Sequence, residues 1–219
     1  FRRYRQVHYA EAGGHPVRDS FRRLGRTFSQ VKGQKHIFLF LLAFFFFIDG
    51  VYTIIDMATA YGTALGLDTP GLLAALLVTQ VVAFPCSILF GRLAGRFSAK
   101  RLIEICILAY LGIAVYAIFL QNQLQFYILA VCVGIFQGGI QSLSRSYYAS
   151  LIPAEQAGEY FGLFDICGKG ASFMGTFLVG AVSQATGSMN LGVGALAVIF
   201  GAGFVLLRAL PAAREMHNI

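Results

Sequence analysis

The sequence predicts an all-α integral membrane protein of six transmembrane helices, with both termini in the cytoplasm. Three observations support this fold class: the composition, the lengths of the apolar segments and the distribution of basic residues. Of the 219 residues, 57% are hydrophobic and 12% are charged, whereas about a quarter of a soluble domain is charged. The lipid bilayer is therefore expected to be the main partner of this chain.

A polar, basic leader precedes the apolar segments and spans residues 1–35. It is expected to be a cytoplasmic leader or interdomain linker. Near its end, Phe21, Leu24, Phe28 and Val31 recur at helical spacing between arginines, a pattern typical of an interfacial amphipathic helix. A disordered basic linker agrees equally well with the glycines and the charge of this region.

Residues 36–219 are expected to form one six-helix transmembrane bundle. A helix of about 20 residues crosses a hydrocarbon core about 30 Å thick, and each of six apolar segments is long enough to do so. The expected spans are 37–64, 72–90, 102–120, 124–148, 160–185 and 191–210.

The basic residues set the expected orientation of these spans. Of the seventeen Lys and Arg residues, nine lie within residues 1–35 and four within 91–101, and Arg145, Arg208 and Arg214 lie at further span ends on the same side. The opposite loops contain no Lys or Arg: 66–71, 121–123 and 186–190. The positive-inside rule then places both termini in the cytoplasm. This distribution favours anionic lipid headgroups, and not nucleic acid, as the partner of the positive charge.

The first segment carries Asp49 and Asp56, which are seven residues apart and so lie on one helix face, about 10 Å from each other. Tyr52 and Thr53 lie near the same stripe. A charge at bilayer depth costs several kcal/mol unless it is paired or hydrated, so these acids predict a solute or proton pathway. The alternative is that both acids bond to hydroxyl or backbone groups of a neighbouring helix.

Polar stripes also run along the fourth and fifth segments. Gln137, Gln141 and Arg145 recur every fourth residue, and Asp165 and Lys169 are one helical turn apart. Lys169 is the one basic residue that no membrane flank accounts for. These stripes predict a water-filled cavity. Hydrogen bonds between helices explain either glutamine alone, and an isolated i,i+4 ion pair is the alternative for the two charges.

Glycines are expected to mark close helix contacts. Gly134, Gly138 and Gly139 allow another helix to approach the fourth segment, and the many glycines of the fifth segment allow it to bend or unwind. The third and sixth segments carry few polar residues and are expected to face lipid. All four cysteines lie inside apolar segments without CxxC spacing, and no catalytic motif is present. No disulfide, metal, cofactor or catalytic residue is expected, and an enzyme is the least expected class.

The loop between the second and third segments resembles an element that major facilitator transporters carry at this place in each six-helix half. Gly95 replaces the family's acid and Ser98 its second glycine, so Glu104 is the acid available to the basic cluster. The resemblance implies a cytoplasmic gate formed by Gly91, Arg92, Arg96, Lys100, Arg101 and Glu104.

Two further stretches resemble the C-terminal half of the vacuole-effluxer-like branch of that superfamily, which includes the autophagy-related vacuolar amino-acid effluxer of fungi. They are 49–55, and 138–146 followed by Pro153, Phe161-Gly162 and Lys169. The resemblance implies helices seven to twelve of a twelve-helix transporter. Segments one, two, four and five would then surround a central cavity, and segments three and six would lie outside it.

The expected function is therefore that of half a secondary active transporter. It would move a small polar solute, such as an amino acid, with proton coupling and by rocking of two bundles. The partner would be an N-terminal six-helix half or a second copy of the chain, in a bacterial inner membrane or a fungal vacuolar membrane. The expected solute and proton pathway comprises Asp49, Tyr52, Thr53, Asp56, Gln137, Gln141, Arg145, Asp165 and Lys169.

Two other classes compete with a transporter. A channel requires a polar stripe through both leaflets, whereas phenylalanines fill the inner half of the first segment. A membrane scaffold that transports nothing needs no charges within the bilayer.

Overall fold

The computed structural model describes residues 25, 27, 28 and 30–210. Within these residues the regular structure is entirely helical, and six helical stretches are long and apolar enough to cross a membrane. The predicted all-α class and the six spans are thus confirmed.

Four of the spans are single helices: α2 (Lys35–Ala64), α3 (Thr69–Ala94), α4 (Ala99–Ile118) and α5 (Gln123–Leu151). After the short 3₁₀ helix η1 (Ala154–Gln156), the fifth span is divided into α6 (Ala157–Gly170) and α7 (Phe173–Thr186). The sixth is divided into α8 (Met189–Gly194) and α9 (Leu196–Arg208).

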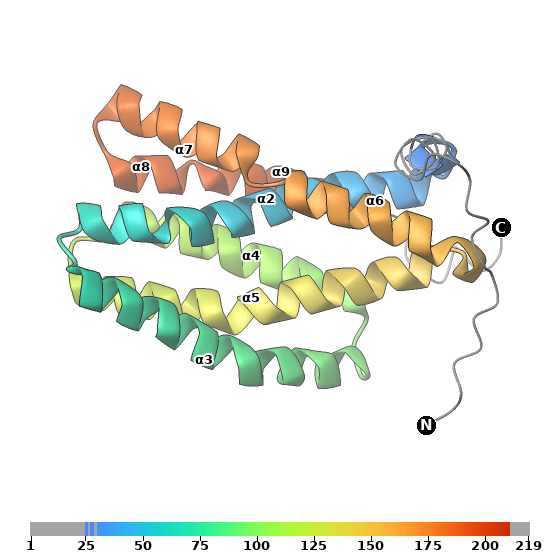
Figure 1. The fold of residues 1–219 in the computed structure, drawn as a ribbon, viewed down its shortest axis with the longest axis horizontal. Helices are drawn as coiled ribbons and strands as arrows, with labels where there is room; N and C mark the ends of the chain where they lie inside the picture. Colours follow the sequence, from blue (N-terminus) through green and yellow to red (C-terminus); the bar gives the residue numbers. More distant parts are fainter. Residues whose placement is uncertain (1–24, 26, 29, 211–219) are drawn as a thin grey trace, which may run out of the picture.

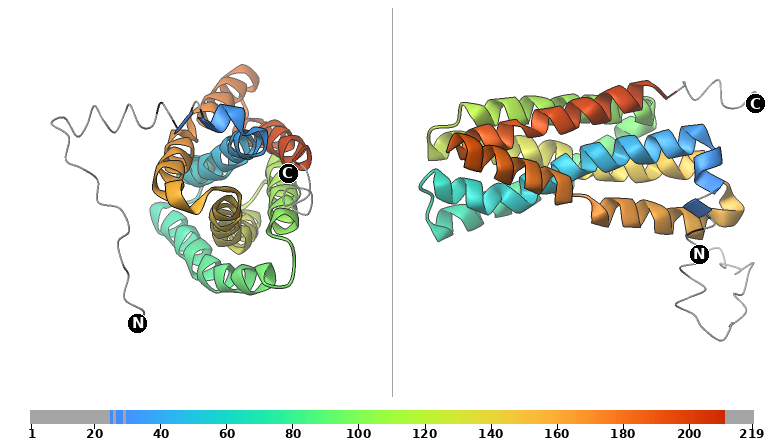
Figure 2. Two further views of the ribbon diagram at one scale, coloured as in Figure 1. Left: turned by 90° about the vertical axis from the view of Figure 1, so that its right-hand side faces the viewer. Right: turned by 90° about the horizontal axis from the view of Figure 1, so that it is seen from above.

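The helices form one elongated bundle (Figure 1). α2 is the most buried span and α3 the least. α2 packs mainly on α9, α4 lies against both α5 and α9, and α3 contacts chiefly α5. α6 runs along α2 on the side away from α9 (Figure 2), and α7 lies between α2 and α8. One face of α2 is therefore covered by the sixth span, and another borders the fifth span.

Glycines allow α3 to pack closely on α5, at the segment where the sequence predicts a close helix contact. A Cβ atom added at Gly134 would lie 2.6 Å from the carbonyl oxygen of Thr79. One added at Gly139 would lie 2.5 Å from the Phe90 ring. Real Cβ atoms do not approach so closely, so the contact between α3 and α5 requires residues without a Cβ atom at these two positions.

An aromatic cluster joins α2, α5 and α6 in the half of the bundle where α2 begins. The Phe44 and Phe164 rings stack with centroids 4.1 Å apart, and Tyr148 stacks on Phe164 at 5.0 Å. The Tyr148 hydroxyl also donates a hydrogen bond to the carbonyl of Tyr160. Stacked aromatic rings bury large apolar areas with defined geometry, so this cluster fixes α6 against α2 and α5.

The two ends of the described chain lie at the same end of the bundle, as an even number of spans requires (Figure 1). Lys100, in the first turn of α4, donates a hydrogen bond to the carbonyl of Leu210. Thr27 donates to Glu159 at the start of α6, with a distance of 2.9 Å. Residues 30–33 are helical and Val31 is fully buried, whereas most of the predicted interfacial helix lies outside the described residues.

Candidate functional site

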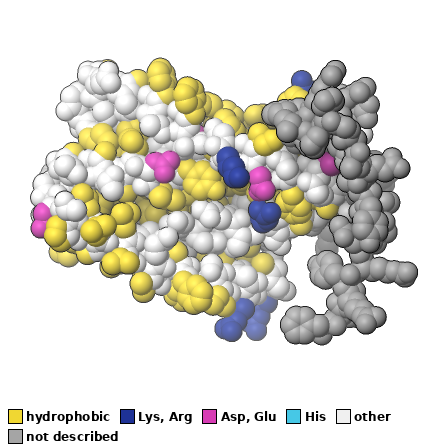
Figure 3. Space-filling model, viewed as in Figure 1, with side chains coloured by type: hydrophobic (Ala, Val, Ile, Leu, Met, Phe, Trp, Pro, Cys, Tyr) yellow, Lys and Arg dark blue, Asp and Glu magenta, His cyan; other side chains and the backbone are white. Residues whose placement is uncertain are grey.

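A polar cavity of about 380 Å³ lies between α2, α5 and α6. Acidic and basic side chains gather over these helices in the middle of an otherwise largely uncharged face (Figure 3). The cavity is lined by Phe44, Ile48, Tyr52, Gly138, Gln141, Ser142, Arg145, Phe164, Asp165, Gly168 and Lys169. Five residues of the expected pathway therefore meet here: Tyr52, Gln141, Arg145, Asp165 and Lys169.

Arg145 and Asp165 form an ion pair across this cavity. The Nη1 atom of Arg145 lies 3.2 Å from Oδ1 of Asp165, and the two side chains are 56% and 47% exposed. The Arg145 guanidinium also lies over the Phe161 ring, 4.9 Å from its centroid. Two contacts with α6 thus hold the end of this long side chain, which belongs to α5.

Lys169 lines the same cavity, one helical turn after Asp165, but is not its partner. In the described part of the chain, no carboxylate lies within 4.0 Å of the Lys169 ammonium. The i,i+4 ion pair considered from the sequence is therefore not formed, because Asp165 pairs with Arg145 of the facing helix. The cavity contains two cationic side chains and one anionic one.

Asp49 and Thr53 lie outside the polar cavity, although they belong to the same helix as Tyr52. Asp49 is 1% exposed and Thr53 is fully buried, and both lie against the first turn of α7. Asp56, seven residues after Asp49, is exposed and lines neither cavity. The two acids of α2 thus have different surroundings, because the helices packed against α2 change along its length.

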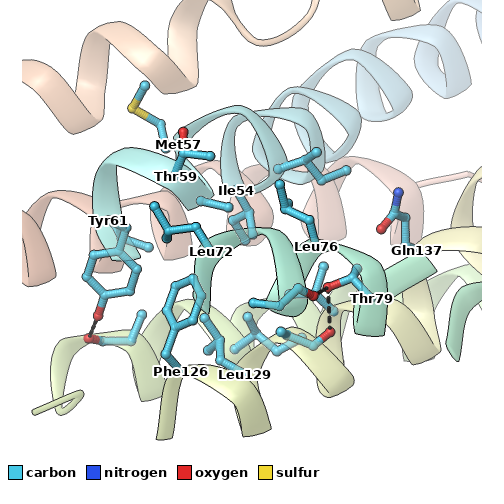
Figure 4. A pocket seen from close by; sticks show the side chains of 18 of the residues that line it. Ile54, Met57, Thr59, Tyr61, Leu72, Leu76, Thr79, Phe126, Leu129 and Gln137 are labelled. Carbon is cyan, nitrogen blue, oxygen red and sulfur yellow. Dashed lines mark hydrogen bonds between the residues drawn. The ribbon is translucent and has the colours of Figure 1, made fainter. Parts of the chain in front are cut away.

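A second, apolar cavity of about 260 Å³ lies among α2, α3, α4, α5 and the sixth span. Figure 4 shows Ile54, Leu72, Leu76 and Phe126 around it. Gln137 contributes to its wall, and the Gln137 Oε1 atom is buried without a hydrogen-bond partner among the described residues. This cavity is not predictable from polar spacing, because a space between apolar side chains leaves no polar pattern in the sequence.

This second cavity also corrects one expectation. Ile113 and Ala117 of α4, together with Val193 and Leu196 of the sixth span, contribute to its wall. The third and sixth segments are therefore not merely lipid-facing supports. Their apolar sequences do not distinguish a side chain that faces lipid from one that faces an apolar cavity.

The expected gate residues surround the turn between α3 and α4. Arg92, Arg96 and Arg101 are exposed, Gly91 lies near the end of α3, and Lys100 bonds to Leu210. Glu104 makes no ion pair with another described residue, and it lies near Tyr147 of α5. Residues of the described chain also include no group of three or more His, Cys, Asp or Glu that could hold a metal ion.

Nearly the whole chain matches one family model. Residues 2–219 match the model described as vacuole effluxer Atg22 like. The chain belongs to the Atg22-like vacuole effluxer family. The resemblance expected from the motifs of the first, fourth and fifth segments is thereby confirmed.

Relatives of this Atg22-like chain occur in bacteria and fungi. The uncharacterized MFS-type transporter YxiO of Bacillus subtilis is 47% identical over 206 residues, which cover 94% of this chain and 48% of YxiO. Autophagy-related protein 22 of Coccidioides immitis is 29% identical over 196 residues, or 80% of this chain and 32% of that protein. Autophagy-related protein 22 of Saccharomyces cerevisiae strain S288c is 29% identical over 175 residues, or 74% and 33%.

The Atg22-like chain thus spans about half the length of the bacterial relative and about a third of the fungal ones. The family description and the name of the bacterial relative both refer to transport. With its six candidate spans, the chain is a multi-pass membrane protein of this family.

Proposed function

We propose that this chain is the C-terminal half of a secondary active transporter that moves a small polar solute, such as an amino acid, with proton coupling. The observation that carries the proposal is the polar cavity, in which Arg145, Asp165 and Lys169 lie between helices of a membrane bundle. Charges in such a bundle are costly, so they usually border water, solute or ions. Rocking of this bundle against a second one would expose the cavity alternately to the two sides of the membrane.

The charges of the cavity favour a solute that carries a carboxylate. Arg145 is already paired with Asp165, whereas Lys169 has no acidic partner among the residues that the structure describes. A solute carboxylate would provide that partner, and Tyr52 and Gln141 would offer further hydrogen bonds. The cavity volume of about 380 Å³ lies within the range of small-molecule sites, which is about 300–1,000 Å³.

The ion pair offers a means of proton coupling. Asp165 is 47% exposed, so protons can reach it from the cavity. Protonation would remove its negative charge and release Arg145 from the pair. Binding of a proton at Asp165 would then change the contact between α5 and α6, which are two walls of the proposed solute site.

A second bundle is required to complete this site. The charged face is open in the six-helix unit (Figure 3), and lipid would not solvate it. The chain covers 48% of the bacterial relative, which supports an N-terminal six-helix half as the missing wall. The proposed location is a bacterial inner membrane. A homodimer mate is the alternative occupant of this face.

Transport by the full natural polypeptide in proteoliposomes tests the proposal. Uptake of radiolabelled amino acids would be measured with and without an imposed pH gradient, and residues 1–219 alone would be reconstituted as the matched control. We expect uptake that rises with the gradient for the full polypeptide and none for residues 1–219. Equal uptake by both, or currents with single-channel steps, would contradict a two-bundle transporter.

A further inference from the structure

The fifth span is interrupted just after Lys169. α6 ends at Gly170, α7 begins at Phe173, and Ser172 between them has φ = 81°, in the left-handed region. Figure 1 shows that the ribbon is offset where α6 passes into α7. The first amides of α7 have no partner within the helix, and the Ser172 side chain makes no capping hydrogen bond. The positive end of α7 is thus left inside the bundle without a local cap.

Asp49 places its carboxyl group at this helix end. Its side chain is 1% exposed, and its Oδ2 atom lies against the backbone of Gly175 in the first turn of α7. Neither carboxylate oxygen has a hydrogen-bond partner of good geometry among the described residues. The contact between Asp49 and α7 is therefore one of proximity to the positive end of the helix, which favours a negative charge there, and not a single hydrogen bond.

Gly175 makes this close approach possible. A Cβ atom added there would lie 2.9 Å from Oδ2 of Asp49 and 2.2 Å from Oγ1 of Thr53. Other glycines of this span, Gly170 and Gly180, have nothing within 4 Å of such an atom. The absence of a side chain is thus required at the residue of α7 that faces Asp49, and not along the whole helix.

We propose that Asp49 is a positioning residue that clamps the first turn of α7 to α2. The clamp fixes the break in the fifth span and thereby the direction in which Lys169, in the last turn of α6, enters the polar cavity. That Lys169 binds solute rests on the proposed function, whereas the clamp does not. Asp49 itself would not touch the solute, because it lies outside the cavity lining.

Hydrogen exchange in the full natural polypeptide tests the clamp, with Asp49→Asn as the test variant. Asp56→Asn is the matched control, since it makes the same change at an exposed position of the same helix. We expect Asp49→Asn to accelerate exchange of amides 173–176 about tenfold or more, with α4 unchanged. We expect Asp56→Asn to leave both regions within about twofold of wild type.

Gly175→Ala provides a second variant in which Asp49 is intact. Its methyl group should separate α7 from α2 and accelerate exchange of the same amides, and Thr53→Ala should partly reverse this by removing the closest oxygen. Because Asp49→Asn and Gly175→Ala disrupt one contact, their combined effect on exchange should be smaller than the product of the two single effects.

A cysteine in place of Lys169 reports how accessible this position is from the cavity. In a background without native cysteines, the maleimide labelling rate of Lys169→Cys should change at least about threefold on addition of Asp49→Asn. Ser142→Cys, on the α5 wall of the same cavity, should keep its rate. These measurements need no transport, so they remain informative if the proposed function fails.

The proposal would be overturned if Asp49→Asn left amides 173–176 at the wild-type exchange rate. It would also be overturned if exchange rose equally in α4, because that result indicates general destabilisation, or if Lys169→Cys and Ser142→Cys changed their labelling rates equally.

Discussion

Asp165 pairs with Arg145 of the facing helix, at 3.2 Å, and not with Lys169 of its own helix, which is one turn away. The choice of partner joins α5 to α6 and leaves an ammonium group in the cavity without a carboxylate from the described residues. One consequence is mechanical, since the pair connects two helices. The other is chemical, since the remaining positive charge is available to an anionic group.

The Arg145–Asp165 pair should contribute little to stability. Both side chains are about half exposed, and exposed pairs are typically worth about 0.2–1 kcal/mol. A double-mutant cycle with Arg145→Ala and Asp165→Ala should therefore give a coupling energy below about 1 kcal/mol in thermal or denaturant unfolding. A coupling above about 3 kcal/mol would indicate instead that the pair is desolvated.

Transport should depend strongly on the Lys169 charge. A hydrogen bond to a charged group is worth about 1.5–3 kcal/mol, so we expect Lys169→Ala to lower solute flux in the full polypeptide by about tenfold or more, and to alter its pH dependence. Lys35→Ala is the control, because Lys35 is exposed at the start of α2. Unchanged flux and pH dependence in Lys169→Ala would remove this residue from the transport mechanism.

The α3–α5 contact should be sensitive to a single methyl group. We expect Gly134→Ala to destabilise the protein by about 1–3 kcal/mol, because the added carbon meets the Thr79 carbonyl. Gly112→Ala on α4 is the matched control, since nothing lies within 4 Å of its added carbon. Alanine there should be neutral or stabilise the helix by up to about 1 kcal/mol. Denaturant unfolding in detergent measures both, and equal effects would contradict the close contact.

Ser172→Gly should stabilise the break between α6 and α7. A non-glycine residue in the left-handed region costs about 1–2 kcal/mol, and glycine adopts the observed φ of 81° without that cost. Ala171→Gly is the control at a neighbouring residue with ordinary backbone angles, where glycine should be destabilising by about 0.5–1 kcal/mol. The two unfolding free energies should move in opposite directions, and a shift of both in the same direction would contradict the left-handed backbone at Ser172.

Both termini should lie in the cytoplasm. A reporter that is active only in the cytoplasm should be active when fused after residue 219, and one fused within the loop 66–68 should be inactive. The reason is the absence of Lys and Arg from that loop and their abundance at the opposite end of the bundle. The reverse pattern of activity would show that basic residues do not set the orientation.

The class, the number of spans and the family are predictable from the amino-acid sequence. Apolar length and composition are properties of each segment alone, so they predicted six spans without knowledge of how the helices pack. Polar spacing likewise predicted that Gln141, Arg145, Asp165 and Lys169 lie on helix faces that meet at water. The glycines of the fourth segment indicated a close contact, but they did not identify α3 as its partner.

Which charges meet depends on how the helices pack in three dimensions. Asp49 and Asp56 have the same chemistry and share a helix face, but α7 covers one and leaves the other exposed. Asp165 has cations within reach on two helices, and the relative position of α5 and α6 selects Arg145. The apolar cavity also arises from how side chains of five spans fit together. Local spacing fixes which residues share a face, whereas burial and pairing depend on the helices that pack against it.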